Sequence, residues 1–279
     1  GYDRRGNFLG LFFTDAFLLS DFFLVRSFLK WKNTYVVKME EWMDIVSELD
    51  AAVSMADFRY NHPEATDAEI VDGSPVLFEA KNLYHPFLGA KAVKNDFTIR
   101  DDNYYIITGA NMAGKSTFLR SLGVNYILAM SGMPVFAGSL KVSRFQLFSS
   151  MRTTDDLTHG ISYFNAELLR LEQLMQFCKR GELRTLIILD EILKGTNSLD
   201  KLNGSRLFLE SISRMPVTGV IATHDLELSR MAESSPGRFH NYCFEIDLGT
   251  DVTYTYKIQP GVARNQNATF LLNKILERN

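Results

Sequence analysis

The spacing of apolar residues divides the chain into two parts. Over residues 7–57 apolar residues recur at three- and four-residue steps, which predicts helices only. From residue 76 onward short apolar runs alternate with helical patterns, as is typical of an α/β protein. Turn-forming clusters at 61–63 and 72–75 lie between the two parts. We therefore predict a small all-helical segment over residues 1–74 and an α/β domain over residues 75–279.

The helical segment is expected to contain two helices. The first covers residues 8–29 and holds seven phenylalanines, but charged residues interrupt it, so no uncharged run reaches the ~18 residues of a membrane span. We expect this helix to be buried against neighbouring helices and to make no membrane contact. A cap at Asn33 or Thr34 is expected to begin the second helix, whose apolar face is available for packing.

The α/β part alternates between the two kinds of pattern. Short apolar runs predict strands at 76–80, 96–100, 104–108, 145–149, 185–190, 218–222, 242–247 and 252–258. Helical patterns predict helices at 115–131, 163–180, 203–214, 225–231 and 267–277. We expect a central mixed sheet flanked by helices.

Composition narrows the classes of function. The chain has 279 residues and a net charge of −3, so a chain-wide basic field for nucleic acid is absent, and contact with DNA is expected mostly through other parts of the protein. The two cysteines form no CxxC pair, which argues against a zinc site or a disulfide framework. The first residues do not resemble a signal peptide. A cytoplasmic location is expected, and membrane association of a longer parent protein remains open.

A glycine-rich loop follows the predicted strand at 104–108. It has the pattern G-x-x-x-x-G-K-S between a strand and a helix, which is the context that phosphate binding requires. Backbone N–H groups of such a loop surround phosphates, Lys115 reaches the β- and γ-phosphates of ATP, and the Ser116 hydroxyl binds Mg²⁺. The candidate ATP-binding residues are Gly109, Ala110, Asn111, Met112, Ala113, Gly114, Lys115, Ser116 and Thr117.

Two further strands end in polar residues that suit the same chemistry. The apolar run at 186–189 ends in Asp190 and Glu191, of which Asp190 would hold Mg²⁺, partly through water, and Glu191 would orient the attacking water. The strand at 217–222 is followed by His224, which could donate a hydrogen bond to the γ-phosphate. Lys115, Glu191 and His224 are therefore the candidate catalytic residues.

The loop and its neighbours resemble the MutS family of mismatch-repair ATPases. The loop TGANMAGKST is similar to the family's TGPNMGGKST, with Ala110 and Ala113 where the family commonly has Pro and Gly. The block at 190–200 resembles the family's DEIGRGTST-x-D, with Leu193 and Lys194 in place of Gly and Arg, and residues 222–224 match its Ala-Thr-His. The resemblance covers about residues 76–260 and implies an ABC-type P-loop ATPase fold.

The same resemblance implies a dimer. Residues 162–168 are similar to the family's Ser-Thr-Phe-x-x-Glu-Met signature, so Ser162 would contact the γ-phosphate bound to the opposite subunit. A homodimer would form through the two ATPase domains over two ATP molecules. The family's adenine-stacking aromatic is expected near residues 92–93, where this sequence has none.

Two functions remain open at this point. One is a DNA-repair ATPase that couples nucleotide state to binding of a mismatch or a related DNA structure. The other is a MutS-like ATPase without mismatch recognition, in a membrane-associated or structural role. A transporter or chromosome-organising ATPase is disfavoured, because no LSGGQ-like signature lies between residues 155 and 190.

Overall fold

The computed structural model describes residues 19–73, 75–151, 163–180, 183–193, 195, 197–248 and 252–264. The chain divides into two compact units, of which the first ends at Asn61 and the second begins at His62.

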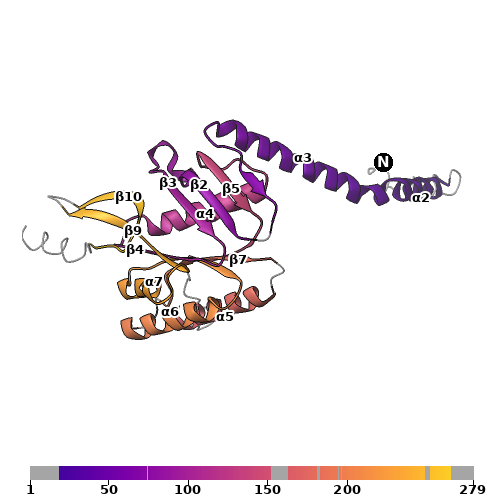
Figure 1. Ribbon diagram of the computed structural model, residues 1–279. Coiled ribbons are helices and arrows are strands. Elements are labelled where there is room, and N and C mark those ends of the chain that lie inside the picture. The colour runs from indigo at the N-terminus through magenta and orange to yellow at the C-terminus, as the bar shows by residue number, and fades with distance from the viewer. Residues whose placement is uncertain are drawn as a thin grey trace, which may run out of the picture. The chain divides into compact units, whose positions relative to one another are not determined.

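In the first unit, residues 20–61 form one unbroken run of helix (Figure 1). Helix α2 (Ser20–Trp31) continues through a π-helical segment, η2 (Lys32–Val36), into α3 (Val37–Asn61). The predicted helix start at Asn33 or Thr34 is therefore wrong. The Thr34 hydroxyl donates to the Lys30 carbonyl, 2.7 Å away within the helix, and so caps nothing.

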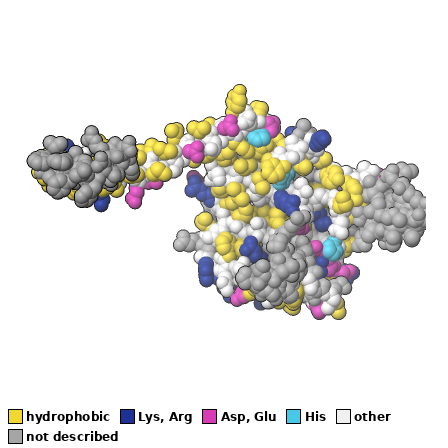
Figure 2. Space-filling model, turned by 180° about the vertical axis from the view of Figure 1, so that it is seen from behind, with side chains coloured by type: hydrophobic (Ala, Val, Ile, Leu, Met, Phe, Trp, Pro, Cys, Tyr) yellow, Lys and Arg dark blue, Asp and Glu magenta, His cyan; other side chains and the backbone are white. Residues whose placement is uncertain are grey.

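Most of the apolar side chains among residues 19–61 are exposed. Phe22 keeps 59% of its surface accessible and Trp42 keeps 46%, and Figure 2 shows hydrophobic side chains along the helix surface. The predicted burial is thus wrong for the described residues, because consecutive helical segments in one line cannot pack against each other. Within the described residues, no helix is both long and apolar enough to span a membrane.

The second unit is built on two sheets. The larger has the order β10-β9-β4-β8-β7-β6 and is parallel except for the antiparallel β10. Its strands are β4 (Tyr104–Gly109), β6 (Gln146–Ser150), β7 (Thr185–Asp190), β8 (Val217–Ala222), β9 (Phe239–Leu248) and β10 (Val252–Pro260). The smaller sheet has the order β1-β5-β2-β3, with β1 (Glu69–Val71), β2 (Leu77–Leu83), β3 (Asn95–Arg100) and β5 (Ser139–Ser143).

Helices cover both faces of the larger sheet (Figure 1). Helix α4 (Lys115–Met130) lies on the face toward the smaller sheet, while α5 (Tyr163–Arg180) and α6 (Ser198–Ile212) lie on the other face. Short segments η3 (Pro86–Lys91), η4 (Leu226–Arg230) and α7 (Met231–Ser234) complete the described helices.

Alternation along the central strands creates two cores. In β4, Tyr105 and Ile107 pack into the core that includes α4, whereas Tyr104 and Ile106 pack into the core that includes α5 and α6. Strand β7 alternates in the same way. Because both faces are buried, these strands read as continuous apolar runs, which is the pattern that predicted them.

The predicted α/β class with mixed sheets flanked by helices is confirmed. Strands β1 and β5 were missed, because they are short and β5 contains only Leu140 and Val142 as large apolar residues. The helix expected at 203–214 begins earlier, at Ser198, where Asn197 accepts a capping hydrogen bond from the Asp200 N–H. The segment 225–231 is mostly a short 3₁₀ helix, and the helix predicted at 267–277 lies outside the described residues.

Candidate functional site

The glycine-rich loop joins β4 to α4, and its two glycines leave no room for a side chain at Gly109 and little at Gly114. Gly109 has φ 152°, and a Cβ there would lie 2.8 Å from the Phe244 carbonyl oxygen. Gly114 has φ 109°, and its Cβ would lie 3.1 Å from the Tyr256 ring. These positions need glycine both for backbone conformation and for close packing. The loop therefore turns tightly while leaving its polar backbone at the edge of the sheet.

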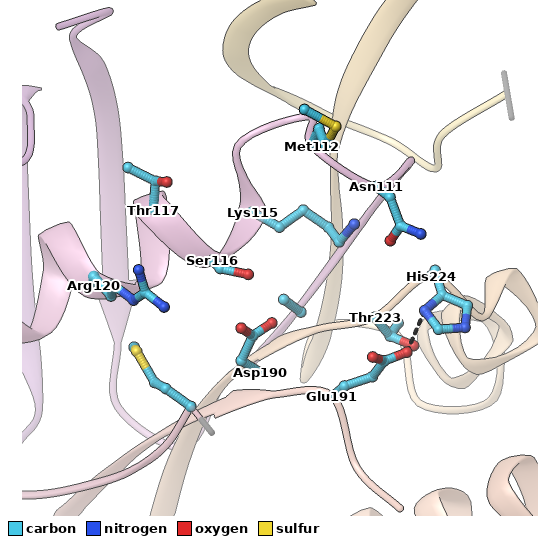
Figure 3. Close-up of a pocket in the computed structure, with 12 residues that line it drawn as sticks. Asn111, Met112, Lys115, Ser116, Thr117, Arg120, Asp190, Glu191, Thr223 and His224 are labelled. Carbon is cyan, nitrogen blue, oxygen red and sulfur yellow. Dashed lines mark ion pairs between the residues drawn. The ribbon is translucent and has the colours of Figure 1, made fainter. Parts of the chain in front are cut away.

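A cavity of about 410 Å³ lies where β4, β7 and β8 end. Since these strands are parallel, their carboxyl ends meet at one edge, which is where α/β sheets bind ligands. Figure 3 shows the side chains that converge there. They are Asn111, Met112, Lys115, Ser116, Thr117, Arg120, Met151, Asp190, Glu191, Ala222, Thr223 and His224.

Lys115 places a cation in this cavity. Its Nζ donates to the carbonyl oxygens of Gly109, at 2.6 Å, and of Ala110, at 2.9 Å. Burial lowers the pKa of Lys115, and the nearby carboxylates of Glu191 and Asp190 act in the opposite direction. A partly desolvated ammonium held by two neutral carbonyls is suited to bind an anion.

Ser116 and Asp190 face the same space. Ser116 lies in the first turn of α4, Asp190 is the last residue of β7, and both side chains point into the cavity in Figure 3. A hydroxyl and a carboxylate are oxygen ligands of the kind that Mg²⁺ uses together with substrate phosphates.

The side chains of Glu191 and His224 are in contact at the far side of the cavity (Figure 3). The contact joins Glu191 Oε1 to His224 Nδ1. Glu191 has a positive φ of 70°, and its backbone N–H donates to the Ala222 carbonyl at 2.9 Å. Such a conformation is unusual for a residue other than glycine and is characteristic of functional sites.

Lys201 joins this pair from α6. Its Nζ lies 2.6 Å from Glu191 Oε1 and 3.3 Å from His224 Nε2. Both ring nitrogens of His224 are thus in contact with side chains of the protein itself. The hydrogen bond from His224 to a phosphate, expected from the sequence, therefore requires the ring to leave one of these partners.

A second pocket lies on the other side of the loop. It has a volume of about 280 Å³, and Thr117 lines both it and the first cavity. Its walls include the rings of Tyr84, His85, Phe118, Phe244 and Tyr256. The sequence has no aromatic residue at 92–93, and Val93 lines this pocket. Strand β10, which lies 163 residues further along the chain at Tyr256, supplies an aromatic ring instead.

The turn after Glu191 also differs from the family pattern in an informative way. Leu193, at a position where the resemblance expects glycine, has a positive φ of 57° and is buried. Gly195 donates its N–H to Glu167 Oε2 at 3.0 Å, which ties the turn to α5. Ser162 and Lys194 lie outside the described residues, so the expected contact of Ser162 with a second subunit stays a prediction.

Sequence reasoning missed Lys201 and Tyr256. Lys201 lies directly after the block that ends at Asp200. The signal that could have found it is its place one turn into the helix that follows the Asp-Glu pair. Tyr256 occurs in an alternating strand pattern, where an aromatic residue is ordinary, and no local signal marks it.

Comparison with known proteins gives a consistent result. The model of MutS domain V matches residues 105–270. The chain is 30% identical over 212 residues to the DNA mismatch repair protein MutS of Staphylococcus carnosus, an alignment that covers 72% of this chain and 24% of that protein. It is 30% identical to DNA mismatch repair protein MSH2 of Zea mays, over 85% of this chain and 27% of that protein. A third relative, MutS of Acetivibrio thermocellus, is 32% identical over 79% of this chain and 26% of that protein. The chain thus spans about a quarter of the length of these relatives.

Proposed function

Because the chain belongs to the MutS family, we propose that residues 75–279 form an ABC-type P-loop ATPase domain that hydrolyses ATP with Mg²⁺. The observation that carries this proposal is the convergence of Lys115, Ser116, Asp190 and Glu191 on one cavity. These residues come from two separate places in the sequence, and each has the chemistry that one part of a phosphoryl-transfer site needs.

The geometry of the loop fits a polyphosphate. Gly109 and Gly114 let the backbone turn through positive φ angles that other residues rarely adopt, and Lys115 provides the positive charge. The start of α4 adds a helix N-terminus, which favours anions. In this role Lys115 exchanges its two carbonyl partners for phosphate oxygens.

Ser116 and Asp190 are the residues that would hold Mg²⁺, the ion that neutralises phosphate charge in this chemistry. Glu191 then orients and polarises the attacking water. Its backbone hydrogen bond to Ala222 and its contact with His224 hold the carboxylate at the edge of the cavity.

The second pocket is suited to the adenine base. It adjoins the first cavity at Thr117, so a nucleotide whose phosphates lie in one can place its base in the other. Tyr256 lies against Gly114 and is 43% exposed, which leaves ring surface available for stacking. We assign Tyr256 as the stacking residue that the sequence does not reveal.

The whole protein is proposed to act in DNA mismatch repair, as the names of its relatives indicate for those proteins. Two copies of this domain would form a homodimer over two ATP molecules, with Ser162 of each reaching the site of the other. Contact with DNA is assigned to parts of the protein outside this chain, in keeping with its net charge of −3.

The catalytic claim is tested by comparing the unaltered chain with Glu191→Gln. We expect the variant to bind ATP with near-normal affinity and to hydrolyse it about 10²-fold more slowly or worse, because it keeps the shape of the side chain and loses the carboxylate. Normal turnover by Glu191→Gln would show that the Glu191 carboxylate takes no part in the reaction.

The biological claim needs the full-length protein. Its steady-state ATPase rate is measured alone, with matched duplex DNA and with mismatched DNA. A rate that changes with one DNA form supports a repair function. A rate that no DNA changes, with hydrolysis intact, assigns the protein to a role outside mismatch recognition.

A further inference from the structure

Lys201 occupies a position where a lysine needs a specific partner. It lies in the first turns of α6, after the Asn197 cap, where the helix N-terminus disfavours a positive charge. Only 12% of its side chain is exposed, so water solvates the ammonium poorly. The Glu191 carboxylate, 2.6 Å from Nζ and itself 17% exposed, supplies the compensating charge.

The contact with His224 determines where the proton of that ring lies. A lysine ammonium donates hydrogen bonds and accepts none, so His224 Nε2 accepts from Lys201 across 3.3 Å. In the neutral ring the proton then lies on Nδ1, which faces Glu191 Oε1. Lys201, His224 and Glu191 form a closed set in which each side chain contacts the other two.

This closed set matters because Lys201 adds one more contact to each of its two partners. The His224 side chain is 54% exposed, and Glu191 leaves the sheet at a residue with positive φ. The long side chain of Lys201, anchored in α6, restricts the rotation of both the Glu191 and the His224 side chains. Lys201 is not among the residues that line the cavity, so it contacts them from outside it.

We propose that Lys201 is a positioning residue of this ATPase site, which holds the Glu191 carboxylate in place and fixes His224 with its proton on Nδ1. The expected effect on the rate of ATP hydrolysis rests on the proposed ATPase function. The expected position of the proton on His224 does not depend on that function. Lys201 acts through Glu191 and His224 and has no direct contact with the nucleotide.

The kinetic test compares Lys201→Met, Lys201→Arg and the control Arg206→Met in the 279-residue chain. Arg206 is also a cation on α6, but its side chain is 61% exposed and pairs with Glu210. We expect Lys201→Met to lower kcat by about tenfold to a hundredfold, the range for loss of one hydrogen bond between charged groups, with KM for ATP changed less than about threefold. Lys201→Arg should recover part of kcat, and Arg206→Met should leave it unchanged. An unchanged or raised kcat in Lys201→Met overturns the proposal.

The second test reads His224 directly. ¹⁵N spectra of histidine-labelled chain are recorded at about pH 8.5, above the ordinary imidazole pKa of ~6.5, and His224 is assigned by comparison with His224→Gln. We expect a protonated Nδ1 in the unaltered chain and a larger share of protonated Nε2 in Lys201→Met, where only Glu191 still favours the proton on Nδ1. A protonated Nε2 in the unaltered chain, or no change in Lys201→Met, refutes the proposal even if every variant lacks ATPase activity. If the tautomer shifts as expected while no variant hydrolyses ATP, the ATPase function fails and the positioning role stands.

Discussion

Replacing Asn125 should destabilise the second unit strongly, because its side chain connects three segments. Asn125 is fully buried in α4. Its Nδ2 donates to the carbonyl of Tyr84 at 3.1 Å and to that of Ser121 at 2.9 Å, while its Oδ1 accepts from the Phe136 N–H at 2.6 Å. These bonds join α4, which begins with Lys115, to the end of β2 and to the segment before β5.

The magnitude follows from the groups that lose a partner. Asn125→Leu keeps a side chain of similar size but leaves the Phe136 N–H and the Tyr84 carbonyl without the Asn125 hydrogen bonds, at about 1–3 kcal/mol each. The better helix propensity of leucine returns about 0.5 kcal/mol. We expect the free energy of unfolding to fall by about 3 kcal/mol, a large part of a typical total of about 5–15 kcal/mol.

Urea unfolding followed by circular dichroism measures this loss, with Asn203→Leu on the exposed face of α6 as the control. The control should change the free energy of unfolding by less than about 0.5 kcal/mol. A loss below about 1 kcal/mol in Asn125→Leu, with an unchanged dependence on urea, would show that these buried bonds do not hold α4 in place.

Two further outcomes are expected. Tyr256→Ala should weaken ATP binding by about tenfold, because one base–aromatic stack is lost, while binding of inorganic triphosphate stays the same. Calorimetry with both ligands measures this, and equal weakening of both would show that the base binds elsewhere. Burial raises the pKa of the Cys178 thiol to about 11, so the unfolded chain ionises this thiol at a lower pH than the folded chain does. The free energy of unfolding should therefore fall as pH rises from about 9 toward 11, and less steeply in Cys178→Ala; parallel pH profiles for the two proteins would contradict this.

The strands that bring the site together could be predicted from the sequence because both faces of them are buried. The runs that become β4, β7 and β8 are almost entirely apolar and end in residues with recognisable chemistry. Since a parallel arrangement places such ends at one edge, the sequence alone predicts that Lys115, Asp190 and His224 converge.

The remaining features depend on contacts that local patterns do not contain. Tyr256 reaches the loop because the β9–β10 pair folds back beside it with an irregular register between Tyr254 and Ile258. The pattern of α3 predicted a packed helix, but amphipathicity says nothing about which partner covers the apolar face. Thr34 looked like a cap, yet capping requires a backbone that leaves the helix, and here the helix continues.

The central claim is that this site binds ATP through Lys115, and a calorimetric titration of ATP with Mg²⁺ into the chain tests it most directly. The account predicts saturable binding of one nucleotide per chain and loss of that binding in Lys115→Ala, whose fold circular dichroism should show to be intact. Near-normal affinity in a folded Lys115→Ala variant, or no binding by the unaltered chain, would contradict it.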